Sequence, residues 1–595
     1  MDIFSVFTMI GGLALFLFGM HVMGDGLSKA SGGRLEQILE KLTSTPFSAV
    51  ILGAGVTAVI QSSSATTVMV VGFVNSGIMK LSQAIGIIMG ANIGTTITSW
   101  ILSLSGIESS NFFVQLLKPS SFSPILAIIG VAMIMFSKNE KKHNVGNILI
   151  GFAVLMTGMD TMSSAVKPLA EVPEFTGILT MFSNPVLGIA AGALLTAVIQ
   201  SSSASVGILQ ALCATGSVTF ATAVPIILGQ NIGTCITAML SSVGANKHAR
   251  RAALVHLYFN IIGTTSFMLL FYLANYLFNF AFMTDAASAT GIAIVHTVFN
   301  IVATVILLPF SKGLEKLAYL TIKEDPIVDV TAEKSEEFML LDPRFLETPG
   351  FAVEQCRKVA VNMAELTKEA LFKSMELVEK YDEDKVKFVH DLETKIDSYE
   401  DELGSYMVKL GQKQLASKES HTLSVLLHSL SDFERISDHA VNIAYATKEM
   451  NEKNLSFSKK AAAELRIFTD AIKEILETTM LVFANEDMEL AVDVEPMEEV
   501  IDYLQAELKQ RHIKRLRKGN CTIEMGLVLT DICTSFERVA DHCSNVAVCV
   551  LQVQEDGYDT HEYLHTIKNT DNENFKQKYD AYMEKYALPQ KANES

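Results

Sequence analysis

Charged side chains are scarce in the first 311 residues of this 595-residue chain. Only 12 of the 47 Lys and Arg residues and 10 of the 65 Asp and Glu residues lie there. So apolar a stretch excludes a soluble enzyme surface and predicts a membrane domain. The rest of the chain carries a net charge near −20. That acidity excludes nucleic acid as a partner, because phosphate neutralisation needs clustered Lys and Arg.

Cysteine is sparse as well. The seven cysteines show no paired spacing, which argues against a disulfide framework and suits a reducing cytoplasm. The first residues lack the basic region of a cleaved signal peptide, so the apolar stretch up to Met23 is expected to be a retained first helix.

An internal repeat dominates the apolar half. Nine residues at 57–65, including Gln-Ser-Ser-Ser, recur identically at 196–204, and the same offset of 139 residues maps 90–95 onto 229–234. Repeated hydrophobic halves, each interrupted by a Gly- and Ser-rich stretch, are how secondary transporters build a substrate site. The sequence therefore predicts a solute transporter.

The apolar segments predict an all-α polytopic membrane domain at 1–311. We expect repeat 1 at about 1–137, repeat 2 at about 145–275 and an extra helix at 291–310, with some helices re-entrant or broken. The basic cluster at 247–251 has no basic counterpart 139 residues earlier. Because basic loops stay in the cytoplasm, the repeats are predicted to be inverted, with the amino terminus outside and the acidic half inside.

Uncharged polar side chains must form the site. Apart from Lys80, no Asp, Glu, Lys or Arg occurs at 43–106, and none occurs at 176–245. Three consecutive serines cannot all avoid lipid in an unbroken helix, so the chain is expected to open around a wet cavity. Free amides at such a break favour an anion, and carbonyls with hydroxyls favour a small cation such as Na⁺. The candidate substrate and ion ligands are Gln61, Ser62, Ser63, Ser64, Thr66, Thr67, Asn92, Gln200, Ser201, Ser202, Ser203, Ser205 and Asn231.

Two further polar elements accompany these motifs. The Gly-x-Asn-Ile-Gly-Thr copies around Asn92 and Asn231 are expected to add a second flexible break per half, completing the ion cage or the opposing wall. His256 with Asn260, and His296 with Asn300, each share one helix face. For these pairs, hydrogen-bonded contacts between helices are favoured over an ion relay.

At these residues the chain resembles the sodium/phosphate cotransporter family, whose hallmark is a pair of Gln-Ser-Ser-Ser motifs in inverted repeats. The resemblance covers residues 1 to about 311. It implies inorganic phosphate as the substrate and Na⁺ as the coupling ion. It also implies that Gln61, Ser62 to Ser64, Gln200 and Ser201 to Ser203 form the phosphate and sodium site.

Beyond the membrane domain, a polar stretch at 312–345 with scattered prolines predicts a linker. Apolar residues then recur at three and four positions in six segments, 351–381, 384–410, 421–450, 461–483, 494–516 and 525–553. This periodicity predicts an all-α bundle at 346–555, followed by a polar tail at 556–595.

The bundle carries duplicated acidic pairs. Glu-Arg-x-x-Asp-His occurs at 434–439 and at 537–542. With a second pair in each half, the candidate metal ligands are Glu393, Asp397, Glu434, Asp438, Glu498, Asp502, Glu537 and Asp541. A spacing of four places each pair on one helix face, which suits Mg²⁺, Mn²⁺ or iron. Solvated charged faces with Glu-to-Arg pairing explain the pattern equally well.

The paired Glu-Arg-x-x-Asp-His elements resemble those of the PhoU family over roughly 345–555. That resemblance implies a metal-binding cytoplasmic regulator of phosphate flux, and a bacterial inner membrane as the location. Phosphate-signalling proteins, membrane lipid and a second copy of the chain in a homodimer are candidate partners.

The resulting hypothesis is a sodium-dependent phosphate symporter with a fused PhoU-like regulatory domain, and not an enzyme. The alternatives are a phosphate exporter, a transporter of another oxyanion, or a membrane-anchored phosphate sensor. His-Glu-x-x-His at 561–565 fits a zinc metalloprotease, but it lies outside the repeats and no further His follows it. Proteolysis is therefore not expected.

Overall fold

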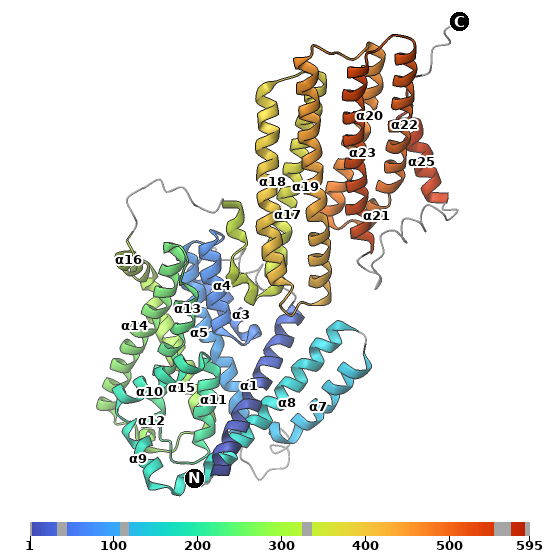
Figure 1. The fold of residues 1–595 in the computed structure, drawn as a ribbon. Coiled ribbons are helices and arrows are strands. Elements are labelled where there is room, and N and C mark those ends of the chain that lie inside the picture. The colour runs from blue at the N-terminus through green and yellow to red at the C-terminus, as the bar shows by residue number, and fades with distance from the viewer. Residues whose placement is uncertain are drawn as a thin grey trace. The chain divides into compact units, whose positions relative to one another are not determined.

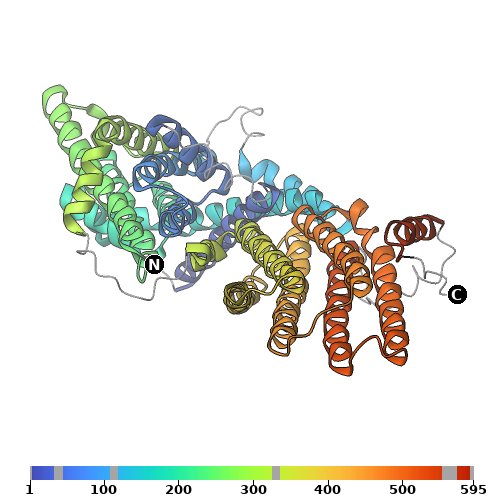
Figure 2. The same ribbon diagram turned by 90° about the horizontal axis from the view of Figure 1, so that it is seen from above.

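The computed structural model describes residues 3–31, 45–106, 118–137, 139–323, 336–552 and 573–589. The chain divides into two compact units, Met1–Phe351 and Ala352–Ser595. In Figures 1 and 2, unit 1 is drawn from blue to yellow-green and unit 2 from yellow to red. All regular elements of the described residues are helical, which confirms the predicted all-α fold class.

Unit 1 is built from long helices and from short ones that meet in pairs. The helices are α1 (Ile3–Ser31), α3 (Pro46–Ile60), α4 (Ser63–Asn75), α5 (Leu81–Ser103), α7 (Pro119–Phe136), α8 (Glu140–Val166), α9 (Pro173–Met181), α10 (Pro185–Ile199), α11 (Ser202–Cys213), α12 (Phe220–Gly233), α13 (Cys235–Ser241), α14 (Lys247–Phe278), α15 (Ala289–Leu307) and α16 (Ser311–Thr321). The main contacts join α1 to α8, α3 to α5 and α10 to α12.

Among the described residues, six helices are long and apolar enough to cross a membrane: 4–30, 81–103, 140–169, 220–241, 247–278 and 289–321. Their outer faces carry exposed apolar side chains such as Phe4, Phe278 and Val305, as a lipid-facing surface requires. By contrast, α3, α4 and α11 have only 15, 13 and 12 residues, too few to span alone. The predicted broken helices are therefore present.

Glycine contacts pack the two helices of each repeat core tightly together. A Cβ on Gly90 of α5 would lie 2.0 Å from the carbonyl oxygen of Val50 in α3. At the matching place in the second repeat, a Cβ on Gly229 of α12 would lie 2.0 Å from the carbonyl oxygen of Ile189 in α10. Only glycine permits such backbone contact. The same contact in both repeats holds α3 and α10 in equivalent positions.

These glycines correct one expectation. The Gly-x-Asn-Ile-Gly-Thr segments were expected to interrupt their helices, but α5 runs unbroken through residues 90–95. In the second repeat, Thr234 between α12 and α13 keeps a right-handed helical conformation. The expected second break is therefore wrong for the first repeat, and in the second repeat it is limited to the single residue Thr234. Glycine inside these helices provides room for a neighbouring backbone instead of flexibility.

Unit 2 is a bundle of antiparallel helices. Its long helices are α17 (Pro349–Glu379), which begins at the end of unit 1, α18 (Glu383–Leu410), α19 (Ser417–Glu452), α20 (Lys459–Asn485), α22 (Val494–Arg517) and α23 (Ile523–Gln552). The shorter α21 (Met488–Ala491) and α25 (Glu573–Lys585) accompany them. The helix α19 packs on both α18 and α23, and Figure 1 shows these three side by side. The six segments with helical periodicity match the six long helices.

The stretch expected to be a linker contains ordered elements. Residues 311–321 form α16, and two 3-10 turns follow at Glu336–Leu340 and Pro343–Glu347. Phe345 is fully buried in unit 1. The residues between α16 and the first turn lie outside the described part of the chain.

Candidate substrate hollow and acidic sites

The two Gln-Ser-Ser-Ser motifs break their helices in the same way. Gln61 ends α3 in the left-handed conformation, with φ 60° and ψ 22°, and Gln200 ends α10 with φ 58° and ψ 22°. Left-handed backbone costs roughly 1–2 kcal/mol for a residue other than glycine. Because the same strained conformation occurs at the equivalent residue of both repeats, the rest of the fold must stabilise it.

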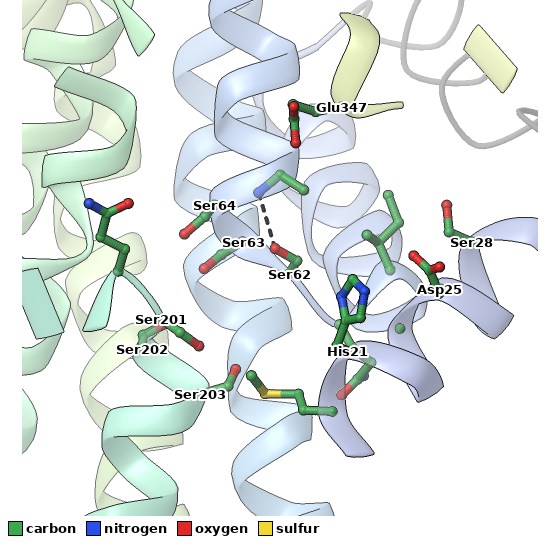
Figure 3. A pocket seen from close by; sticks show the side chains of 16 residues that line it. His21, Asp25, Ser28, Ser62, Ser63, Ser64, Ser201, Ser202, Ser203 and Glu347 are labelled. Atoms are coloured by element: carbon green, nitrogen blue, oxygen red, sulfur yellow. Dashed lines mark hydrogen bonds between the residues drawn. The ribbon is translucent and has the colours of Figure 1, made fainter. Parts of the chain in front are cut away.

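A serine then starts the next helix in each repeat. Ser62 caps α4 by accepting a hydrogen bond from the backbone N–H of Ala65 at 3.1 Å, drawn as the dashed line in Figure 3. Ser201 caps α11 by accepting from the N–H of Ala204 at 3.2 Å. Serine is a favoured residue at this position because its oxygen satisfies one free N–H. Each motif thus ends one apolar half-helix and starts another.

Both motifs line one shared hollow of about 290 Å³ in unit 1. Figure 3 shows Ser62 to Ser64 facing it from one repeat and Ser201 to Ser203 from the other. The lining residues are Met20, His21, Gly24, Asp25, Ser28, Ile60, Gln61, Ser62, Ser63, Ser64, Ala65, Gln200, Ser201, Ser202, Ser203 and Glu347. The first turns of α4 and α11 therefore both border this space, and the positive ends of two half-helices attract an anion.

The hollow is also lined by ionisable residues that the duplicated motifs do not reveal. Asp25 and His21 come from α1, and Glu347 comes from the turn that precedes unit 2. Asp25 lies 3.7 Å from the ammonium group of Lys29. The expectation of a site made only of uncharged groups is therefore wrong for the hollow as a whole. Among the described lining residues, none is Lys or Arg.

Several predicted ligands lie away from this hollow. Thr66, Thr67, Ser205, Asn92 and Asn231 are not among its lining residues. The hydroxyl of Thr66 contacts the hydroxyl of Thr57 at 3.0 Å, and the hydroxyl of Thr67 donates to the carbonyl of Ser63 at 2.9 Å. The Thr66 hydroxyl thus links α4 to α3, and the Thr67 hydroxyl donates within the first turn of α4.

The two asparagines make paired contacts between helices. Asn92 donates to Asn260 at 2.7 Å, and Asn231 donates to Asn300 at 2.6 Å. His296 contacts the hydroxyl of Ser99 at 2.8 Å. The predicted interhelical hydrogen bonds are thus confirmed for these residues. They join α5 and α12, the helices that flank the broken pairs, to α14 and α15.

His256 differs from His296. It is fully buried, and neither ring nitrogen has a hydrogen-bond partner among the described residues. Ser99, the partner of His296, corresponds to Ala238 in the second repeat, which has no hydroxyl to offer His256. The loss of this hydroxyl in the second repeat accounts for one of the two unpaired nitrogens of His256; His296 also contacts Asn231 at 3.2 Å.

A hydrogen bond from a neighbouring helix holds the side chain of Gln61. Its side-chain oxygen accepts a hydrogen bond of 2.9 Å from Thr98 of α5. This contact fixes the orientation of the amide beside the hollow. The corresponding residue of the second repeat, Thr237, donates instead to the carbonyl of Thr234 at 2.9 Å.

In unit 2, the predicted acidic pairs come together within each half. Glu498, Asp502 and Asp541 offer carboxylate oxygens that all lie within 4.8 Å of one another. Glu498 also forms a similar group with Glu495 and Glu499, which the sequence pattern did not single out. Hard divalent cations prefer such carboxylate clusters.

The other acidic set consists of Glu393 and Asp397 in α18 and Glu434 and Asp438 in α19. Burial raises pKa values in this set, and its carboxylates lie close enough to one another to add to that shift. Burial, reinforced by the charge of Asp438, raises the pKa of Glu434 to about 7. Burial and the charge of Asp397 raise the pKa of Glu393 as well. Arg435 lies 3.3 Å from Asp438 and neutralises part of this charge. Carboxylates that repel one another can share a divalent cation. Among the described residues, however, ligand atoms group closely enough for a metal only around Glu498.

Comparison with known proteins gives the relationships of both units. The family model described as Na⁺/Pi-cotransporter matches the chain in two copies, at residues 15–164 and 155–295. This model covers most of the membrane half, which is therefore similar to the Na⁺/Pi-cotransporter family. Two PhoU domains match at residues 360–447 and 465–550, within the bundle.

Relatives cover either the whole chain or one of its parts. YjbB of Salmonella typhimurium, whose name provisionally assigns it to inorganic phosphate export, is 24% identical over 94% of this chain and 100% of its own length. PhoU homolog 1 of Thermotoga maritima, named as a phosphate-specific transport system accessory protein, is 25% identical over 34% of this chain and 87% of its own. Sodium-dependent phosphate transport protein 2A of rat is 38% identical over 16% of this chain and 15% of its own.

Only site residues that are duplicated in the internal repeat could be identified from the sequence. The duplicated motif identifies Gln61 and Gln200, because both halves keep it. Asp25, at the end of the first apolar segment, was the one available signal for the contribution of α1. Nothing in the repeat pattern indicates Glu347. The His-Glu-x-x-His segment at 561–565 lies outside the described residues.

Proposed function

We propose that this protein is a sodium-coupled transporter of inorganic phosphate. The observation that carries the proposal is the shared hollow, which both Gln-Ser-Ser-Ser motifs line at two helix starts. Helix amino termini and hydroxyls bind an oxyanion without a fixed positive charge. Broken helices from two repeats around one polar space are the arrangement that secondary transporters use.

The cation follows from the same geometry. With no Lys or Arg among the described residues of its lining, the hollow offers no fixed charge to neutralise phosphate. A bound Na⁺, held by serine hydroxyls, carbonyls or Asp25, would supply that charge. Sodium and phosphate would then stabilise each other in the hollow, and this mutual attraction would couple their movement.

Phosphate is favoured over sulfate for a chemical reason. At neutral pH phosphate keeps at least one proton, whereas sulfate keeps none. Carboxylates such as Asp25 can accept a hydrogen bond from a protonated oxyanion and repel an unprotonated one. Arsenate, which is also protonated, should compete with phosphate more strongly than sulfate does.

The experiment measures radioactive phosphate uptake into proteoliposomes with and without a Na⁺ gradient. We expect uptake to require the gradient and to collapse in both Gln61→Ala and Gln200→Ala. Gly55→Ala is the control, because a Cβ at Gly55 meets no atom within 4 Å. Uptake that is unaffected by both glutamine substitutions would contradict the proposed site.

The direction of transport requires its own measurement, because YjbB is named for export. Flux is measured from each face of right-side-out and everted vesicles, with Na⁺ on either side. Symport predicts inward flux along the Na⁺ gradient, and export predicts net outward flux. Phosphate binding with no flux in any arrangement would favour the sensor alternative.

For the topology, we propose inverted repeats in a bacterial inner membrane, with unit 2 in the cytoplasm. The basic residues near 247–251 and after 311 support this orientation. Cysteine labelling from each side tests it. A cysteine introduced on unit 2 should react with a membrane-impermeant reagent only in everted vesicles.

For unit 2, we propose a PhoU-like regulatory role with a divalent metal such as Mg²⁺, Mn²⁺ or iron at each acidic set. The grouping of Glu498, Asp502 and Asp541 supports this role. Metal analysis of the purified chain is the test. Asp502→Asn and Asp541→Asn together should lower the bound metal, while Asp470→Asn in α20, outside both sets, should not.

A further inference from the structure

A short segment before unit 2 docks onto the ends of the membrane helices. We name residues 336–348 the strap; it contains the turns Glu336–Leu340 and Pro343–Glu347. Phe345 of the strap is fully buried. Its ring lies 5.6 Å from that of Phe73 in α4 and 4.9 Å from that of Phe351, measured between centroids. An aromatic cluster therefore anchors the strap on the first repeat.

A polar clasp adds to this anchor. The buried carboxylate of Asp342 accepts a hydrogen bond from Asn75 of α4 at 2.6 Å and another from Arg344 at 2.6 Å. Arg344 also donates to the carbonyl of Ser241, the last residue of α13, at 2.8 Å. Charge-assisted bonds of this kind are strong when water is excluded. The strap thus connects α4 of the first repeat with α13 of the second.

The docking site exists in one repeat only. A Cβ on Gly72 would lie 2.7 Å from the Phe345 ring, so the ring needs glycine at this position. In the second repeat, the residues corresponding to Gly72, Phe73 and Asn75 are Ala211, Leu212 and Ala214. These residues provide neither the space, nor the aromatic partner, nor the amide. Duplication therefore did not produce this site, which is specific to one end of the transporter.

The docked strap brings Glu347 to the hollow. Glu347 lines it together with Ser62 to Ser64, and Figure 3 shows its carboxylate above these serines. A carboxylate beside an anion site opposes the binding of an anion. Five residues later the chain enters unit 2, so a force on the strap from that unit acts close to the hollow.

We propose that the strap is an inhibitory latch. When docked, it holds Glu347 at the hollow and lowers the affinity for phosphate; when released, it removes that charge and raises the affinity. This inference rests on the proposed phosphate transport and adds its regulation. It makes the strap the covalent route by which unit 2 acts on the site.

The test compares full-length variants in proteoliposomes. Glu347→Gln removes the charge and keeps the strap docked, whereas Gly72→Ala dislodges Phe345. Both should lower the half-saturating phosphate concentration by on the order of fivefold, since the first removes a nearby unit charge and the second moves that charge away from the hollow. Gly55→Ala is the matched helix-glycine control and should change nothing.

Docking has an independent readout. Trypsin cleavage after Arg344, detected by mass spectrometry as a fragment beginning at Phe345, should be slow in wild type and in Glu347→Gln. It should be at least about tenfold faster in Gly72→Ala, because local opening exposes the buried strap. Cleavage at the wild-type rate in Gly72→Ala would overturn the docking site.

The remaining outcomes separate the latch from the transport function. Faster cleavage in Gly72→Ala with an unchanged phosphate affinity would overturn the inhibitory role. An unchanged affinity in Glu347→Gln would do the same. If wild type carries no phosphate flux in either direction, the proposed function fails instead, and phosphate binding by the same variants then decides the latch.

Discussion

Protonation of Glu434 should control both metal binding and the stability of the PhoU bundle. Its pKa is raised to about 7 by burial and by Asp438, so about nine-tenths of this side chain is protonated at pH 6 and about one-tenth at pH 8. Metals bind carboxylates only after the proton leaves. Mn²⁺ affinity should therefore fall by about tenfold per pH unit below pH 7 and level off above pH 8.

Without metal, the same shift makes the folded state less stable as the pH rises. A carboxyl group whose folded-state pKa is raised stabilises the fold fully below its unfolded value of 4.5, and this contribution is lost as the pH increases through about 7. The full shift corresponds to roughly 3 kcal/mol. Solvent screening of this partly exposed group reduces the expected loss to about 1 kcal/mol.

Hydrogen exchange of α18 and α19, and calorimetric titration with Mn²⁺, measure the two effects in the full chain. With a chelator present, the opening free energy obtained from exchange, after correction for the intrinsic pH dependence of amide exchange, should be larger at pH 5.5 than at pH 8, and Glu434→Gln should remove most of this difference. Glu449→Gln, on the same helix but paired with Lys453, should keep it. The reasoning fails if Glu434→Gln retains the wild-type pH dependence, or if Mn²⁺ affinity is the same at pH 6 and pH 8.

Three further predictions concern the membrane unit. Gly90→Ala should lower stability by about 2 kcal/mol, because its Cβ meets a backbone carbonyl, while Gly55→Ala should be neutral; thermal unfolding in detergent compares them. Thr98→Val should reduce phosphate flux by about fivefold through the loss of one hydrogen bond to the motif glutamine, and Thr237→Val, which has no such bond, should leave flux intact. Ser62→Ala removes a helix cap and should cost about 1 kcal/mol in the same unfolding assay, beyond any effect on flux.

Much of the architecture could be predicted because the residues that determine it recur in the internal repeat or at regular helical spacing. The polar break at each Gln-Ser-Ser-Ser motif was predictable, since consecutive hydroxyls cannot remain in an intact helix facing lipid. The bundle helices were predictable from apolar periodicity. In each case local sequence and burial require the same structure.

Other features could not be predicted because they depend on contacts between distant segments. Gly90 looked like a flexible point, yet it permits close helix packing, and only the neighbouring backbone distinguishes the two uses. Asp25 and Glu347 reach the hollow from outside the duplicated motifs, so no internal comparison could reveal them. Thr98 was hidden because its counterpart Thr237 has a different partner.

The left-handed glutamines have a practical consequence for protein engineering. Glycine at positions 61 and 200 would relieve roughly 1 kcal/mol or more of backbone strain at each site. If the glutamine amides bind the substrate as we propose, these replacements would give more stable proteins that no longer transport it. Screens for thermal stability or expression yield would therefore enrich inactive variants, so libraries of this protein should first be selected for transport activity.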